Sequence, residues 1–347
     1  MIRRWLALAL AALAAPAIAQ PITFPDHFDS IGTPLQSLQT REGRMVHFTD
    51  TGEADWLPML YVGGVGTSAR PPELIAFLDT LRRRLKVRII AVERNGLGDT
   101  AYDPAWTFDD YNSEVRQVLS RLGIGRFALV AISGGGAYAG HVAAAMPERL
   151  TSWHMLAAIA SAPASNPVCT NDETALKAGL AQQVGAPRVF WSMPTDGVAA
   201  KVPGFTDRTA DEGAHAFFIA GQRGDVRGVA REYRRFCDAP AAVAAFPAPA
   251  FFYYGQADPL VPPSQGEFWA SKVAGKVAFR RYPGEGHDVQ YRHLDQLLLD
   301  VAGYGDYTLV CQRGRARLRP GALAPAQLAA GSTLGICAWQ AERSNQP

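Results

Sequence analysis

Short apolar runs alternate with longer segments of helical periodicity from Met45 to about residue 300. Each run is rich in apolar residues over its whole length, as expected for strands covered on both faces of a sheet. This rhythm is typical of α/β proteins with a mostly parallel sheet and helices on both faces. The runs that predict strands are Leu57–Val62, Val87–Val92, Phe127–Ile132, Trp153–Ile159, Pro249–Tyr254 and Val277–Tyr282.

Three helices are predicted between these strands. The first begins at Pro71, and its end carries Arg82-Arg83-Arg84, in agreement with the preferences of helix termini. We therefore interpret the arginine run as a solvated helix end. The second helix is predicted from about Phe108 to Leu122, and the third follows Ser133 and continues to about Met146. The apolar stripe of the first helix comprises Leu74, Phe77, Leu78, Leu81 and Leu85.

The alternation stops between Ser161 and Phe246, where Pro, Gly and scattered aromatic residues interrupt short helical patterns. We interpret residues 161–247 as a cap inserted over the carboxyl edge of the sheet, with residues 20–160 and 248–303 forming the core. Residues 304–347 are predicted to be a C-terminal appendix. The helical patterns of the cap are Asp211–Gln222 and Val229–Phe236, and its aromatic residues, which are either pocket walls or cap core, are Phe190, Trp191, Phe205, Phe217 and Phe218.

The amino terminus resembles an export signal. Charged residues precede an apolar run from Trp5 to Ala15, and small residues lead to Ala19. The run is shorter than the ~20 residues of a membrane-spanning helix, so residues 1–19 are predicted to be a signal peptide cleaved after Ala19. The mature protein is then expected in the periplasm or outside the cell, with no membrane span.

Charge and cysteine usage narrow the function classes further. Cleavage removes two of the 34 basic side chains. The basic side chains that remain then equal the 32 acidic side chains in number, so the mature chain is formally neutral. No nucleic-acid partner and no anionic membrane is indicated. The four cysteines lack the C-x-x-C or H-x-x-x-H spacing of a zinc site.

An exported protein keeps disulfides, and four cysteines permit three pairings. We favour Cys169 with Cys237 and Cys311 with Cys337, because each pair lies within one region of the sequence. The alternative is four free, buried thiols.

Ser133 is the first candidate for catalysis. It stands in Ala131-Ile132-Ser133-Gly134-Gly135, directly after a predicted strand and before a predicted helix. Small neighbours permit the sharp turn that lifts a nucleophilic hydroxyl above a sheet edge. The same turn directs backbone N–H groups toward a developing oxyanion. Ser followed by glycines is commonly only a loop, but here the strand and helix flank it.

Because of this turn and the segments around it, the sequence resembles the α/β-hydrolase superfamily. Several segments that resemble those of the family occur here in the same order along the chain. Leu122-Gly123-Ile124 leads into the strand before Ser133, and Pro147-Glu148-Arg149-Leu150 follows the next helix. Glu93-Arg94-Asn95-Gly96-Leu97-Gly98-Asp99-Thr100 is similar to the family's turn with an acid, Arg, Gly-x-Gly and a small hydroxyl residue. The resemblance covers about residues 45–160 and 248–300.

A serine hydroxyl needs a base within hydrogen-bond reach and a third group that orients the base. His287 follows the last predicted strand of the core in Gly284-Glu285-Gly286-His287, where glycines allow a tight loop. The six other histidines lack this setting. We therefore predict that His287 is the general base.

Asp258 is the candidate for the third group. It follows the strand Pro249–Tyr254, in a loop where Asp before Pro is ordinarily a turn former. The resemblance implies a catalytic role, because the family keeps its acid after this strand and has the chain order Ser, Asp, His. Asp258 is then expected to hold one imidazole tautomer and to stabilise the imidazolium.

The resemblance also implies an oxyanion hole. Its donors are expected to be the backbone N–H groups of Gly134 and Val65, the latter in Gly63-Gly64-Val65-Gly66. Many relatives have His-Gly in this turn, whereas this chain has Gly63 in place of the His. Each such donor stabilises a transition state by roughly 3 kcal/mol.

These residues predict a serine hydrolase that cleaves a small-molecule carboxylic ester, or a related acyl substrate, through an acyl-enzyme on Ser133. The cycle uses no metal and no organic cofactor. Cleavage of peptide, lactone or carbon–carbon bonds, and acyl transfer, are alternatives on the same scaffold.

Two other classes remain open. Gly64-x-Gly66-x-x-Ala69, with Glu93 ending the next strand, imitates a dinucleotide-binding fingerprint of NAD(P)-dependent oxidoreductases. That interpretation leaves Ser133, Asp258 and His287 without a role. A non-catalytic binding protein on a hydrolase scaffold is the other alternative, although binding does not require all three residues.

Overall fold

A twisted eight-stranded sheet forms the centre of the computed structural model, with strand order β1-β2-β4-β3-β5-β6-β7-β8. The model describes residues 33–171, 174–176, 178, 226–238, 240–321 and 328–337. The proposed signal peptide, the pattern Asp211–Gln222 and the five cap aromatics lie outside them. The strands are β1 Gln36–Gln39, β2 Met45–Thr51, β3 Leu57–Val62, β4 Val87–Val92, β5 Phe127–Ile132, β6 Leu150–Leu156, β7 Ala250–Gly255 and β8 Val277–Tyr282.

Six of these strands, β4-β3-β5-β6-β7-β8, run parallel, and β2 pairs with β4 antiparallel. Every position of β4, β5 and β7 is buried, which confirms for these strands the expectation of cover on both faces. The expectation was wrong for β8, whose positions are mostly half-buried or exposed because it is an edge strand of the sheet. The prediction missed β1 and β2, an antiparallel pair at the sheet edge. Their alternating or largely exposed positions carry no continuous apolar run.

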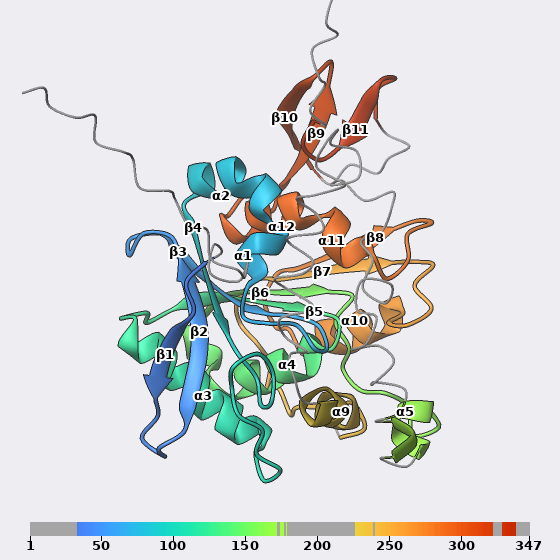
Figure 1. Cartoon of the computed structure of the whole chain (residues 1–347). Coiled ribbons are helices and arrows are strands. Elements are labelled where there is room, and N and C mark those ends of the chain that lie inside the picture. The colour runs from blue at the N-terminus through green and yellow to red at the C-terminus, as the bar shows by residue number, and fades with distance from the viewer. Residues whose placement is uncertain are drawn as a thin grey trace, which may run out of the picture.

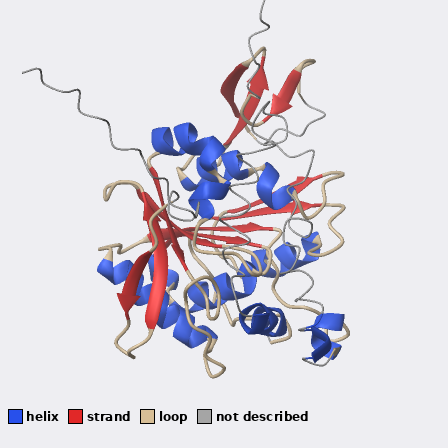
Figure 2. Ribbon diagram, viewed as in Figure 1, coloured by secondary structure: helices blue, strands red, loops and turns tan. Residues whose placement is uncertain are grey.

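Helices cover both faces of the sheet, as predicted (Figure 1, Figure 2). In the view of Figure 1, α3, α4 and α10 lie below the sheet, and α1, α2, α11 and α12 lie above it. The helices are α1 Pro71–Leu74, α2 Asp79–Leu85, α3 Phe108–Arg121, α4 Gly135–Ala145, α5 Pro167–Thr170, α9 Val226–Arg235, α10 Pro263–Ala270, α11 Val289–Arg292 and α12 Leu294–Val301, with 3₁₀ turns at Ala76–Leu78 and Pro147–Arg149.

The helix predicted from Pro71 is interrupted by the 3₁₀ turn Ala76–Leu78. A 3₁₀ turn aligns residues three apart on one face, and Ile75 and Leu78 are both buried there. The interpretation of the arginine run was wrong for Arg82. Its guanidinium is buried and donates to the carbonyls of Thr51 and Val87, which joins α2 to the sheet.

Strand β6 ends at Leu156, three residues before the predicted end. Ala157 has a φ of 41°, a left-handed conformation that an extended strand does not contain. The chain therefore leaves the sheet at Ala157, close to the turn that holds Ser133.

The C-terminal appendix forms a second, three-stranded antiparallel sheet with the order β10-β9-β11. Its strands are β9 Tyr307–Gln312, β10 Arg315–Pro320 and β11 Ser332–Leu334. This sheet is attached to α12, because Asp295 accepts from the backbone N–H of Ile336 at 3.0 Å and Gln296 donates to the carbonyl of Tyr307 at 3.0 Å. Among the described helices, none has the length and apolar character that crossing a bilayer requires.

Both favoured disulfide pairings are confirmed. Cys169 pairs with Cys237 across 68 positions of sequence, and Cys311 pairs with Cys337 across 26. The first joins the segment after α9 to α5, and the second closes the loop that contains β10 and β11.

Replacing Cys311 and Cys337 together by Ser is expected to destabilise the appendix by roughly 3 kcal/mol, because a loop of this length is no longer closed in the unfolded chain. Hydrogen exchange followed by mass spectrometry measures this: amides of β9 and β11 are expected to exchange faster in the variant. The amides of β5 serve as the internal control. Equal protection of β9 and β11 in both proteins would contradict the expectation.

Candidate active site

Ser133 occupies a sharp turn between β5 and α4. Its φ is 49°, a region that costs a non-glycine residue about 1–3 kcal/mol. Backbone hydrogen bonds hold this conformation: Ser133 N–H donates to the carbonyl of Leu156 at 3.1 Å, and its carbonyl accepts from Gly136 and Ile159 at 3.0 and 2.9 Å. The neighbouring strand β6 and the segment after it thus fix the turn.

The glycines after Ser133 are required by close packing. A Cβ at Gly135 would lie 2.3 Å from the carbonyl oxygen of Val62, and one at Gly134 would lie 2.5 Å from atoms of both Val65 and Phe236. The turn therefore packs directly against the end of β3 and against Phe236, which follows α9.

The structure brings Ser133, His287 and Asp258 together in one hydrogen-bonded line. Ser133 Oγ lies 2.9 Å from His287 Nε2, and His287 Nδ1 lies 2.8 Å from Asp258 Oδ2. A carboxylate only accepts, so Nδ1 carries the proton toward Asp258 and Nε2 is left to accept from the serine hydroxyl. The side chain of Asp258 is fully buried and that of His287 is 20% exposed, so the imidazole keeps some contact with solvent.

Asp258 is held by the loop that follows β7. Its second oxygen, Oδ1, accepts from the backbone N–H groups of Leu260 at 2.8 Å and Val261 at 2.9 Å. Both carboxylate oxygens therefore have partners, and the one facing His287 has a fixed direction.

The loop that carries His287 is fixed to the β7 loop. Ala257 N–H donates to the carbonyl of Glu285 at 2.9 Å, and a Cβ at Gly255 would lie 2.3 Å from that same oxygen. Glu285 also contacts His293 Nε2 at 2.8 Å, and the His293 ring stacks on Tyr282. Packing and hydrogen bonds thus set the distance between Asp258 and His287.

The turn Gly63–Gly66 lies beside Ser133, where an added Cβ at Gly64 would be 3.3 Å from Ser133 Cβ. In the part of the chain that the structure describes, the backbone N–H groups of Val65 and Gly134 have no protein acceptor. Buried N–H groups are rarely left without a partner. These two groups are therefore kept as the candidate donors of the oxyanion hole.

Sequence reasoning missed a buried ion pair behind this turn, formed by Arg94 and Glu232, whose side chains are 4% and 2% exposed. Arg94 appeared only as a member of the family-like motif, and the predicted pattern Val229–Phe236 gave Glu232 no role. No signal in the sequence links two residues 138 positions apart.

Glu93 is buried next to Arg94. Its Oε2 accepts from the backbone N–H groups of Asp99 and Thr100 and from the Thr100 hydroxyl. Burial nevertheless raises the pKa of Glu93 to about 7, because desolvation outweighs these hydrogen bonds. The carboxyl group orders the turn after β4 and does not reach Ser133, His287 or Asp258 by any hydrogen bond within the described ranges. Those ranges also contain no group of three His, Cys, Asp or Glu side chains suited to a metal ion.

The model of the alpha/beta hydrolase family matches residues 59–301, which include all three members of the hydrogen-bonded line. The chain belongs to this family. A search of curated proteins finds no match.

Solved structures of α/β hydrolases share the fold. A hydrolase from Pseudomonas aeruginosa superposes with a TM-score of 0.58 at 17% identity, covering 78% of this chain and 98% of its own. An esterase from Thermogutta terrifontis gives 0.56 at 19%, covering 78% and 97%. An epoxide hydrolase from metagenomes of hot environments gives 0.56 at 18%, covering 78% and 98%. At these identities the similarity concerns the fold, so reaction and substrate are argued from the site.

Replacing Glu93 by Gln is expected to change how stability depends on pH. The pKa of the Glu93 carboxyl group is raised from 4.5 to about 7 in the folded state, so the folded protein favours the protonated form of this group. The folded protein therefore loses stability as the pH rises from 4.5 to about 7. The amide of the Glu93→Gln variant does not titrate, and the variant is therefore expected to gain up to about 3 kcal/mol relative to the wild type between pH 4.5 and 7.5.

Urea unfolding at a series of pH values measures this difference. Glu267, whose side chain is 55% exposed, provides the control through Glu267→Gln. A difference between wild type and E93Q that stays constant across the interval would contradict the expectation.

Proposed function

We propose that this protein is a serine hydrolase that cleaves carboxylic esters through an acyl-enzyme on Ser133. The observation that carries the proposal is the continuous line from Ser133 Oγ to His287 Nε2 at 2.9 Å and from His287 Nδ1 to Asp258 at 2.8 Å. This arrangement supplies a nucleophile, a base and an orienting carboxylate.

In the first half-reaction, Ser133 Oγ attacks the carbonyl carbon of the ester while its proton passes to His287 Nε2. Asp258 stabilises the resulting imidazolium through the Nδ1 hydrogen bond. The carbonyl oxygen becomes an oxyanion and accepts from the N–H groups of Val65 and Gly134, each worth roughly 3 kcal/mol in the transition state. The oxyanion then collapses, the bond to the alkoxy group breaks, and His287 protonates the departing alcohol.

The second half-reaction releases the acid. His287 takes a proton from a water molecule, whose oxygen attacks the acyl carbon of the ester formed with Ser133. Collapse of the second oxyanion breaks the bond to Ser133 Oγ, which regains its proton from His287. The cycle needs no metal ion and no organic cofactor.

Ester cleavage is preferred over peptide or carbon–carbon bond cleavage and over acyl transfer because it makes the smallest demand on the site. A lactone is a cyclic ester, so its cleavage is an alternative that this reasoning does not separate from ester cleavage. An alcohol leaves more readily than an amine or a carbanion, and water is the simplest acceptor. The esterase among the structural neighbours supports this choice.

We also propose that residues 1–19 are a cleaved signal peptide and that the mature enzyme works in the periplasm or outside the cell. The two disulfides support this location, because such bonds persist in oxidising compartments. The substrate is then a small ester that reaches the enzyme outside the cytoplasm.

Ser133→Ala is expected to lower the turnover of p-nitrophenyl esters at least about 10³-fold, because the nucleophile is lost. A panel of acyl lengths from acetate to laurate measures this rate and the acyl preference together. A fluorophosphonate probe is expected to label the wild type and not the variant.

The matched control is Ser120→Ala, which removes an exposed hydroxyl that bonds only within α3. Full activity of S133A, or its labelling by the fluorophosphonate probe, would contradict the proposal. Tight binding of a nicotinamide cofactor by an unlabelled wild type would instead support the oxidoreductase alternative.

The rate is also expected to fall in acid, because a protonated imidazole cannot take the proton of Ser133. The measurement is kcat/KM for an uncharged ester at a series of pH values. His141 offers a control: burial lowers its pKa, and its ring stacks on Phe108. His141→Asn is expected to retain the profile, and a flat profile for the wild type would count against His287 as the base.

A further inference from the structure

The described part of the proposed cap contributes a buried carboxylate that lies behind the turn beside Ser133. Glu232 lies in α9, and its Oε2 accepts from the backbone N–H of Gly66 at 2.8 Å. Gly66 ends the turn Gly63–Gly66 and precedes Glu232 by 166 positions. A side chain of the cap therefore holds the turn that presents the Val65 N–H.

Arg94 connects the same carboxylate to the other end of the turn. Its Nε donates to Glu232 Oε1, and its Nη1 and Nη2 donate to the carbonyls of Gly63 at 2.7 Å and Gly64 at 2.6 Å. The guanidinium also lies over the ring of Tyr138. Glu232 and Arg94 thus hold the turn on both sides of Val65, at the carbonyls before it and the N–H after it.

Helix α9 is itself anchored, so the position of Glu232 is set from outside the turn. Gly228 packs on the turn after β4, where an added Cβ would lie 2.4 Å from the carbonyl oxygen of Gly96. At the other end of α9, Arg235 donates to the carbonyl of Trp106 at 2.7 Å.

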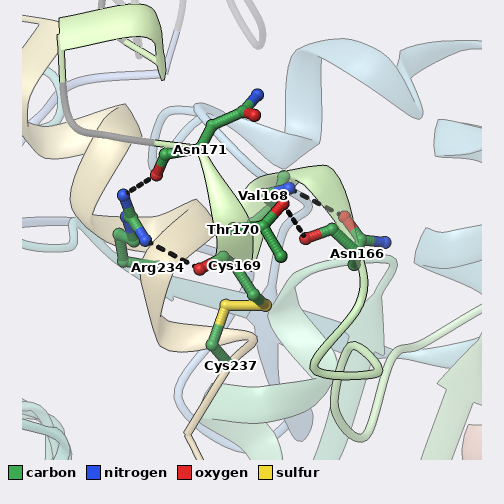
Figure 3. The surroundings of a disulfide bond; sticks show 7 residues. All are labelled: Asn166, Val168, Cys169, Thr170, Asn171, Arg234 and Cys237. Carbon is green, nitrogen blue, oxygen red and sulfur yellow. Dashed lines mark hydrogen bonds between the residues drawn. A yellow bond between two sulfur atoms is a disulfide. The ribbon is translucent and has the colours of Figure 1, made fainter.

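A disulfide strengthens this second anchor. Cys237 is bonded to Cys169, and Arg234 donates to the carbonyls of Cys169 and Asn171 (Figure 3). The carbonyl of Phe236 accepts from Ala162 N–H at 2.7 Å, close to where the chain leaves the core.

We infer that Glu232 is a positioning residue of the reaction: through Arg94 and Gly66 it fixes the Val65 N–H where the oxyanion forms. This inference rests on the proposed ester hydrolysis. Its consequence is that α9 supports the rate of the chemical step in addition to any contact with substrate. A displacement of about 1 Å in such a donor costs up to about 100-fold in rate.

Stability alone poorly explains the buried pair of Arg94 and Glu232. Two charges that are removed from water lose hydration free energy, which is often larger than the free energy of their attraction. Proteins in which apolar residues replace a buried ion pair are often as stable. The carboxylate does have a geometric task here, because its two oxygens serve Arg94 Nε and Gly66 N–H at the same time.

Two variants test the inference. Glu232→Gln keeps the size of the side chain but places an amide NH₂ against one of the two donors. Glu232→Asp keeps the charge beside Arg94, so the fold is retained, but the shorter side chain no longer reaches both donors. For both, kcat for p-nitrophenyl esters is expected to fall about 10- to 100-fold, with KM changing less than about threefold if the substrate contacts are intact.

A second readout isolates the oxyanion site. Phenylboronic acid forms a tetrahedral adduct with a catalytic serine, and its negative oxygen occupies the position of the oxyanion. Its affinity for E232Q and E232D is expected to weaken by the same factor as kcat/KM. A loss of structural stability alone would not produce this parallel change.

The matched control is Asp50→Asn, which breaks the pair of Asp50 with Arg88, whose side chains are 12% and 8% exposed, on β2 and β4. It is expected to lower the melting temperature and to leave kcat unchanged. Wild-type kcat and boronate affinity in E232Q and E232D, whatever their melting temperatures, would overturn the positioning role. A wild type without Ser133-dependent turnover would overturn the proposed function instead.

Discussion

The contact between Asp258 and His287 depends on the parallel pairing of β7 and β8. Parallel neighbours end at the same edge of a sheet, so the loops that follow them emerge side by side. The hydrogen bond from Ala257 to Glu285 then fixes the two loops against each other. Ser133 reaches the same edge because β5 belongs to the same parallel set, separated from β7 only by β6. The candidate site thus follows from strand order and direction.

A second constraint acts on the opposite side of Ser133. The turn Gly63–Gly66 has few side chains of its own, and its shape is held by Arg94 from the core and Glu232 from α9. Glycines permit the close approach of this turn to Ser133 but do not fix its conformation. The buried ion pair supplies the rigidity that the sequence of the turn lacks.

The sequence predicted the elements whose residues carry a local signal. Strands such as β3, β4, β5 and β8 have the predicted bounds because they are short segments rich in apolar residues that stand between polar segments. Ser133, His287 and Asp258 were found because each stands in a loop directly after such a strand. Strands β1 and β2 were missed because an edge pair is partly exposed and lacks that run.

The remaining differences depend on contacts between distant segments. The sequence indicated a solvated helix end at Arg82. In the structure, its guanidinium instead donates to carbonyls of β2 and β4. Glu232 resembled an ordinary charge on a cap helix, because its two partners lie far away in the sequence. A charge pattern along one helix does not reveal which of its members is buried by another part of the chain.

The disulfide between Cys169 and Cys237 has a consequence for proteolytic cleavage of the chain. The two cysteines bracket most of the sequence between the end of β6 and the start of β7. A single peptide-bond cleavage between them leaves both fragments covalently joined at the base of the cap. After a single cut, the disulfide still holds the segment that follows α9. One cleavage of the polypeptide therefore does not by itself separate Glu232 from the site.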